Sequence, residues 1–248
     1  MKKLTSIVIF LVGCVPLLYA QNDLSFGGNY TEWEWSESIP SLKLTGEMKE
    51  GKDCKSEYGI CLGNPQEKTY IGLMLNLFYY KMSNIENVYG GQISLFNLVH
   101  NNYGVQLGTN NLCQNNSILQ AAIAVNAVML KNNGAQVSVL INAVTGDNHG
   151  CQMSAVGNTS LNNCGFQLGT INHVRQNNQG VQWGFLNVAR NQGQQNGGRQ
   201  IGIVNANFKK GSFQIGIFNT SEDSNLQIGL LNHAPSGNFF WLMPFVNW

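Results

Sequence analysis

The chain has 248 residues, of which 43% are hydrophobic, so it is long enough for one substantial domain with a buried core. Charged residues make up only 11%, and the formal net charge is +1. A chain with so little basic excess lacks the electrostatic footprint of a nucleic-acid-binding protein, so we expect no nucleic-acid partner.

Residues 1–20 predict a signal peptide. Lys2 and Lys3 supply a positive start, residues 4–18 are mostly apolar, and Ala20 is a small residue before a polar one. The apolar stretch has about fifteen residues, whereas a membrane-spanning helix needs roughly 20. We therefore expect an exported protein, located at the cell surface, in the outer membrane, in the periplasm or in the medium.

A second interpretation of the same segment stays open. Leu11-Val12-Gly13-Cys14 is similar to a lipobox, in which the cysteine is acylated. If Cys14 carries a lipid, the chain is anchored to a membrane. If cleavage follows Ala20, it is not.

Residues 21–69 predict an N-terminal cap or accessory segment, because they hold most of the acidic residues of the chain. Export permits disulfides, and Cys54 and Cys61 are close enough in sequence to close a small loop. Cys151 and Cys164 are a weaker candidate pair, which leaves Cys113 without one.

Residues 91–232 repeat one short phrase, and this is the most specific pattern in the chain. Tyr70–Asn76 is similar to a degenerate first copy, so we assign residues 70–248 to a repeat domain. The clear copies run Gln-x-Gly-x-x-Asn, and successive glutamines are 13 to 18 residues apart. The best copies place the key side chains at Gln182, Gln200, Gln214, Gln227, Asn187, Asn205, Asn219 and Asn232.

Within each copy, apolar residues alternate with others, which predicts a β-strand. We expect Phe213, Ile215 and Ile217 to face the core, on the side opposite Gln214 and Gly216. The central glycine predicts that another layer of the protein approaches closely there.

One copy per coil predicts an all-β fold, a parallel β-solenoid of about ten short coils. Like residues then lie one above the other about 4.8 Å apart, so that glutamines and asparagines form amide ladders. The alternative is an up-and-down β-barrel of the outer membrane, with a pore-like function. The fixed polarity of the phrase and an alternation of only six or seven residues favour the solenoid, since a spanning strand needs roughly 9–11.

The repeated Gln-Ile-Gly-Ile/Leu-x-Asn phrase resembles the surface repeat-containing protein family known from spirochaetes and some other bacteria, many of whose members are lipoproteins. The C-terminal segment Leu242-Met243-Pro244-Phe245-Val246-Asn247-Trp248 is also similar to that family. The resemblance covers residues 70–248 and implies a surface or envelope location. It implies no catalytic residues.

We expect no enzymatic activity, no cofactor and no metal site. Carboxylates are too scarce in the repeat domain for a polysaccharide-cleaving mechanism with paired acids, the third functional candidate. They are Asp147, Glu222 and Asp223. Histidines are expected at turns or in a sparse row along one edge; they are His100, His149, His173 and His233.

The expected function is structural or adhesive, with an unidentified surface ligand. Candidate ligands are a polysaccharide or a host or envelope protein. A polysaccharide would dock on flat amide arrays with help from Trp183, Tyr103 and Phe166. Membrane association is expected through a lipid anchor or the outer membrane.

Overall fold

A computed structural model describes residues 42–43, 58–62, 69–75, 86–190, 198–210, 213–223, 226–235 and 242–247. All of them belong to the second of two compact units, Ile39–Trp248. The predicted signal peptide, Cys14 and Cys54 lie outside the described residues, and so does the side chain of Cys61. The predicted Cys54–Cys61 disulfide therefore stays a prediction.

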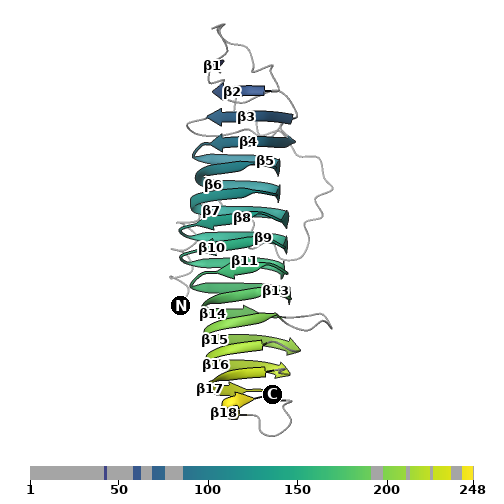
Figure 1. Cartoon of the computed structure of the whole chain (residues 1–248), viewed down its shortest axis with the longest axis vertical. Helices are drawn as coiled ribbons and strands as arrows, with labels where there is room; N and C mark the ends of the chain where they lie inside the picture. The colour runs from purple at the N-terminus through teal and green to yellow at the C-terminus, as the bar shows by residue number, and fades with distance from the viewer. Residues whose placement is uncertain are drawn as a thin grey trace, which may run out of the picture. The chain divides into compact units, whose positions relative to one another are not determined.

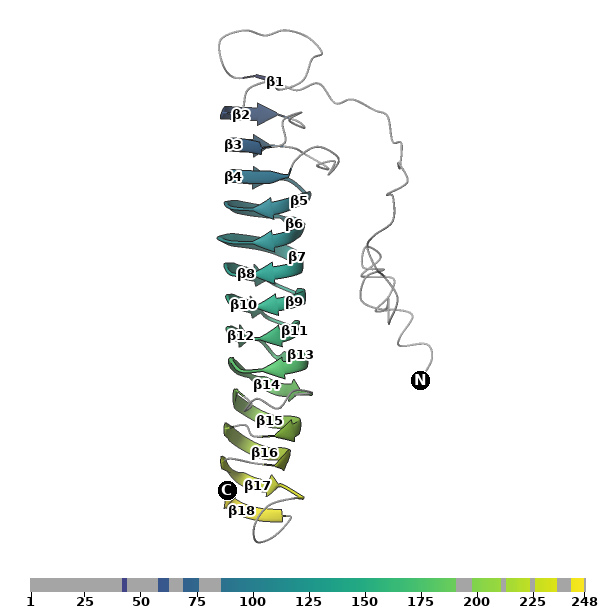
Figure 2. The ribbon, with the colours of Figure 1, turned by 90° about the vertical axis from the view of Figure 1, so that its right-hand side faces the viewer.

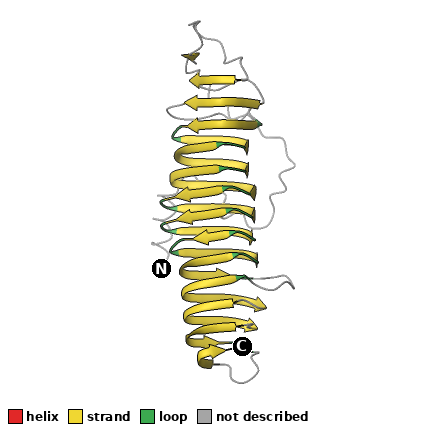
Figure 3. Cartoon of the chain, in the orientation of Figure 1, coloured by secondary structure: helices red, strands yellow, loops and turns green. Residues whose placement is uncertain are grey.

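The regular elements of the described residues are all β-strands, and short turns join them where the connecting residues are described (Figure 3). They are β1 (Leu42–Lys43), β2 (Tyr58–Leu62), β3 (Thr69–Leu75), β4 (Asn87–Ile93), β5 (Phe96–Asn102), β6 (Val105–Asn116), β7 (Leu119–Asn132), β8 (Ala135–Ser138), β9 (Ile141–Asn148), β10 (Cys151–Ser154), β11 (Gly157–Asn163), β12 (Phe166–Leu168), β13 (Ile171–Asn178), β14 (Val181–Ala189), β15 (Arg199–Lys210), β16 (Phe213–Asp223), β17 (Leu226–His233) and β18 (Leu242–Asn247).

The strands from β2 to β17 pair in parallel, each with the equivalent strand of the next coil, so the coils stack one on another (Figure 1). Gln182, Gln200, Gln214 and Gln227 are successive register partners. The prediction of a parallel β-solenoid is confirmed. The up-and-down barrel is wrong for the described residues, because its neighbouring strands would run in opposite directions.

Each coil has three sides, which we define by their buried residues. The first side is a short strand centred on the repeated glutamine, as in β8, β10 and β12. A bend then leads to the second side, which carries the asparagine of the phrase at the start of β9, β11 and β13. The third side follows the register shift within these strands and ends at a second buried asparagine. Figure 2 shows β8, β10 and β12 opposite β9, β11 and β13.

Antiparallel strands lie at both ends of the stack. β1 pairs with β2, and β18 pairs with β17. Each reverses the chain direction at the end of the parallel sheet, which covers an edge that would otherwise offer unpaired backbone groups to another chain. The parallel stacking begins at Tyr58 in β2, earlier than residue 70, where the sequence pattern becomes recognisable.

The predicted orientation of the strands is wrong. Gln214 is fully buried, whereas Ile215 and Ile217 are exposed and Phe213 is only partly covered. The interior of the solenoid is therefore built mainly of amide side chains, and the larger apolar side chains lie outside. The physical reason is that a buried amide costs little when a neighbouring coil supplies its hydrogen-bond partners at the strand spacing.

Candidate interaction surface

A glutamine ladder runs through the interior of the first side. From Gln106 onward, each glutamine Nε2 donates to the Oε1 of the glutamine one coil earlier, over 2.6 to 3.1 Å. All ten side chains have no exposed surface. The ladder consists of Gln92, Gln106, Gln120, Gln136, Gln152, Gln167, Gln182, Gln200, Gln214 and Gln227.

A first asparagine ladder runs through the second side with the opposite polarity. Up to Asn219, each Nδ2 donates to the Oδ1 of the asparagine one coil later, over 2.7 to 3.0 Å. The same Nδ2 donates to a backbone carbonyl of the first side, as Asn187 does to Ile201 over 2.9 Å. The ladder consists of Asn97, Asn111, Asn126, Asn142, Asn158, Asn172, Asn187, Asn205, Asn219 and Asn232.

A second asparagine ladder closes the third side. Its Nδ2-to-Oδ1 bonds are 2.7 to 2.8 Å long and link Asn102, Asn116, Asn132, Asn148, Asn163 and Asn178. Between the two asparagine ladders, a row of small side chains such as Val128, Val144 and Ala189 fills the remaining interior. Because all three ladders are buried, their amides are unavailable to a ligand, and the predicted amide surface for a polysaccharide does not form.

The bend between the first and second sides explains the central glycine. A Cβ at Gly216 would lie 2.3 Å from the backbone oxygen of Gly202 and 2.6 Å from Nδ2 of Asn205. The asparagine side chain occupies the space inside the bend. Where the bend contains one residue more, between Gln120 and Asn126 for example, Ala122 replaces glycine.

The outward face of the first side is apolar over its whole length. One row, following each glutamine, consists of Ile93, Leu107, Ala121, Val137, Met153, Leu168, Trp183, Ile201, Ile215 and Ile228. The row preceding each glutamine is also apolar from Val105 to Leu226, apart from Arg199. Nine turns at about 4.8 Å make these rows about 43 Å long.

The apolar surface continues around the bend onto the second side. At the bend, Leu95, Ile123, Val139, Phe185, Ile217 and Leu230 are between 39% and 67% exposed. The row before the first asparagine ladder adds Phe96, Ile171, Phe218 and Leu231, all exposed, and one polar residue, Asn110. The row after this ladder is mostly apolar or small and also contains Thr159, His173, Thr220 and His233. We call the outward faces of the first side, the bend and the second side together the apolar ridge.

Charge gathers on the third side. Seven Asp, Glu, Lys and Arg side chains belong to the part of the chain whose side chains are described, and Arg199 is the one that lies on the ridge. The others are Glu86, Lys131, Asp147, Arg175, Arg190 and Glu222. The coils are therefore amphipathic in cross-section, with a wide apolar arc and a narrower polar one.

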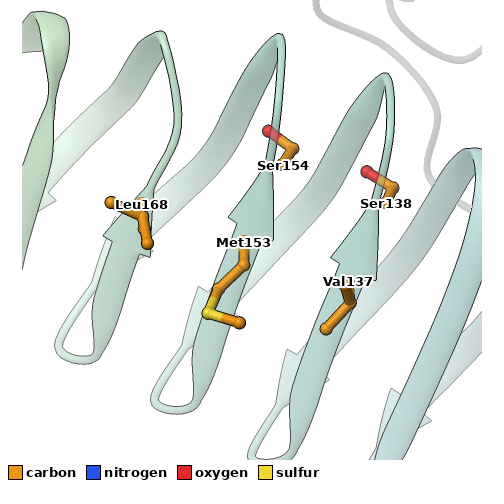
Figure 4. A pocket seen from close by; sticks show the side chains of 5 residues that line it. All are labelled: Val137, Ser138, Met153, Ser154 and Leu168. Carbon is orange, nitrogen blue, oxygen red and sulfur yellow. The ribbon is translucent and has the colours of Figure 1, made fainter.

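A shallow hollow of about 190 Å³ lies on the ridge between β8, β10 and β12 (Figure 4). Val137, Met153 and Leu168 come from successive coils and line one part of it, while Ser138 and Ser154 lie at the bend. Both serine hydroxyls are inaccessible and lack a hydrogen-bond partner. The hollow is open and mostly apolar, so it is part of the apolar surface of the ridge.

The aromatic residues predicted to stack on a polysaccharide are not brought together. Trp183 and Phe166 lie on the first side in adjacent coils. Tyr103 follows the second asparagine ladder and stacks on Tyr89, with ring centroids 4.7 Å apart. The three rings therefore do not form one platform.

The histidines do not form a single row either. His173 and His233 occupy equivalent positions on the second side, while His100 lies on the third side and His149 at a turn. Burial, together with the positive charges of Arg190 and Arg175, lowers the pKa of His173. Both effects favour the neutral form of this imidazole.

The three described cysteine side chains carry free thiols, so the weaker candidate pair Cys151–Cys164 does not form. Cys113 is fully buried among the small interior residues, and burial raises the pKa of its thiol. Burial also raises the pKa of Cys151.

The candidate acidic residues are likewise separated. Asp147 accepts a hydrogen bond from Asn162 over 2.8 Å, five coils before β16, which carries Glu222 and Asp223. Among the described residues, no group of three His, Cys, Asp or Glu side chains is arranged to hold a metal ion. The same residues contain no helix that is long and apolar enough to cross a membrane.

Comparisons with known proteins gave no match, whether to a family model, to a curated protein or to a solved structure.

Proposed function

We propose that this chain is an exported, non-enzymatic protein of the cell surface or envelope, which acts by binding an apolar partner through the apolar ridge. The observation that carries the proposal is the inverted arrangement of the coil. Amides hold the interior together, and large apolar side chains such as Ile123, Phe185 and Leu230 are left outside. Soluble proteins rarely expose contiguous apolar patches above a few hundred Å², and larger ones mark interaction sites.

Two sequence features support the envelope location. Residues 1–20 have the pattern of an export signal, and the repeated phrase is similar to that of bacterial surface repeat proteins. A long array of equivalent coils supplies a repetitive surface, which suits adhesion or scaffolding better than catalysis, for which convergent titratable groups are needed.

Fractionation of a diderm bacterium that expresses the full chain tests the proposal. We expect the protein in the envelope fraction, released by detergent and retained in high salt, because an apolar contact is insensitive to ionic strength. Replacing Ile123 and Phe185 by asparagine should shift part of it to the soluble fraction. Recovery in the cytoplasm, or release by salt alone, would contradict the proposal.

A further inference from the structure

The apolar ridge has a geometry that limits what can cover it. It extends over two sides of each coil and the bend between them, and the most exposed side chains, Ile123, Phe185 and Leu230, lie at the bend itself. A second copy of the chain could pack a flat sheet face against the first side, about 10 Å away. Such a contact would leave the bend and the second side in water. A fluid apolar phase covers the first side, the bend and the second side together.

The backbone of the ridge is suited to an apolar phase. On the first and second sides, the parallel strands bond each coil to its neighbours above and below, from Gln92 to Asn232. The glutamines and the asparagines of the first ladder point inward and form hydrogen bonds within the ladders. Arg199 on the first side and His173 and His233 on the second side are polar residues of the outward faces. Hydrocarbon tolerates only protein surfaces whose backbone groups are satisfied internally, and the paired strands of the first and second sides meet this condition.

The distribution of charge gives the orientation. Of the seven charged side chains that are described, Arg199 lies on the ridge. Lys131 and Asp147 lie on the third side, and Arg175, Arg190 and Glu222 lie where the second side turns into the third. Amphipathic helices with a similar division of apolar and charged faces lie in the plane of a membrane, with the apolar face about 5–10 Å deep. In the solenoid the same division extends along about 43 Å of stacked coils.

We propose that the apolar ridge binds directly to the acyl-chain region of a lipid layer, with the solenoid axis in the plane of the membrane and the third side in water. The inference rests on the proposed function and names the partner of the same surface. The chain would not depend on a covalent lipid at Cys14 for this contact.

Vesicle flotation tests the inference, using the full chain and vesicles of phosphatidylcholine without anionic lipid. The variant Ile123→Asn with Phe185→Asn removes two exposed apolar side chains from the bend. The matched control, Leu130→Asn with Phe208→Asn, removes two side chains of similar exposure from the third side. We expect the first variant to partition at least about tenfold more weakly and the control to stay within about twofold of the parent. Equal effects of the two variants would overturn the inference.

A depth measurement complements the flotation. Trp183 lies on the first side and is 54% exposed. Lipids brominated on the acyl chains should quench its fluorescence, and the quenched component should disappear in Trp183→Phe. Quenching unchanged by this substitution would mean that the ridge does not reach the acyl chains. Circular dichroism and thermal melts of every variant confirm that the coils are intact, since the replaced side chains lie outside the core.

Light scattering separates the lipid inference from the proposed function. If vesicle binding is absent but the chain self-associates in a manner that Ile123→Asn with Phe185→Asn abolishes, the occupant is a second copy and the lipid inference is wrong. If this variant changes neither vesicle binding nor self-association, the ridge is not a binding surface, and the proposed function fails with it.

Discussion

An inner rung of a buried amide ladder is hydrogen-bonded to a neighbour on each side. Asn187 accepts from Asn172 over 2.9 Å, and its own Nδ2 donates to Asn205 over 2.8 Å and to the Ile201 carbonyl. Three partners therefore depend on one side chain that has no exposed surface. Amide dipoles aligned in this way strengthen one another in an interior of low dielectric.

We expect Asn187→Ala to destabilise the protein by about 2–4 kcal/mol, because it leaves buried polar groups of two neighbouring coils without a hydrogen-bond partner. Asn232 is the last rung, and Asn219 keeps its bond to Ile228 when that rung is removed. Asn232→Ala should therefore cost roughly half as much. Urea denaturation measures both changes, and equal costs would show that position within the ladder does not matter.

A different constraint acts at the bend, where space rather than hydrogen bonding decides the residue. Gly216→Val would push a Cβ against the Gly202 carbonyl of the preceding coil and against Asn205. We expect a loss of about 3 kcal/mol or more, since neither the backbone nor a fully bonded amide can move aside. Asp147→Ala removes one partly buried hydrogen bond and should cost about 1 kcal/mol. Thermal melts that showed the two variants equally stable would contradict this account.

The residues at the two ends of the stack contact the terminal amides of the glutamine ladder as well as the edges of the sheet. The glutamine ladder presents its last acceptor, Oε1 of Gln227, toward β18, where Asn247 donates to it over 3.4 Å. At the other end, the register partner of Gln92 is Met74, and Nε2 of Gln92 has no hydrogen-bond partner. The ladder thus ends in an amide at one side and in a buried apolar residue at the other.

Removal of residues 236–248 takes away β18 and exposes the edge of β17. We expect the truncated chain to form end-to-end assemblies, because the exposed strand offers unpaired backbone groups to another molecule. Light scattering should show a mass that grows with protein concentration. The point variant Asn247→Ala keeps the strand and loses only one long hydrogen bond, so it should stay in the same state as the parent. Assembly by both variants, or by neither, would argue against a role for β18 as a cap.

The whole stack behaves as a one-dimensional array in which each coil contacts only its neighbours. Gln152 and Gln167 are register partners, and so are the residues that follow them. One full coil can therefore be removed without changing the partner types on either side of the cut.

Deletion of residues 152–166 joins Cys151 to Gln167 and restores the ladders. We expect a folded protein with a melting temperature only a few degrees lower, because a single repeat and its interface are lost. Deletion of residues 152–158 removes a glutamine and a first-ladder asparagine without completing a coil, and it should prevent cooperative unfolding. The shapes of the two melting curves provide the comparison.

The sequence by itself determined the period, the parallel direction and the rungs. The fixed polarity of the phrase from Gln182 to Asn232 identified the residues that lie above one another, because a parallel stack aligns equivalent positions. It did not determine which face is inside. Alternation divides a strand into two faces, and the usual rule would bury Ile215 and Ile217 rather than Gln214.

Closure of the coil determines which face is inside. Closure of the coil places each amide within 3.1 Å of its equivalent in the next coil along the glutamine ladder, so burial satisfies the amides. The narrow bends at glycine leave room for asparagine but not for a larger apolar side chain. The apolar ridge, and with it the proposed contact with lipid, follows from this closure. It could not be predicted from the repeat pattern, because alternation divides each strand into two faces without deciding which of them the closed coil turns inward.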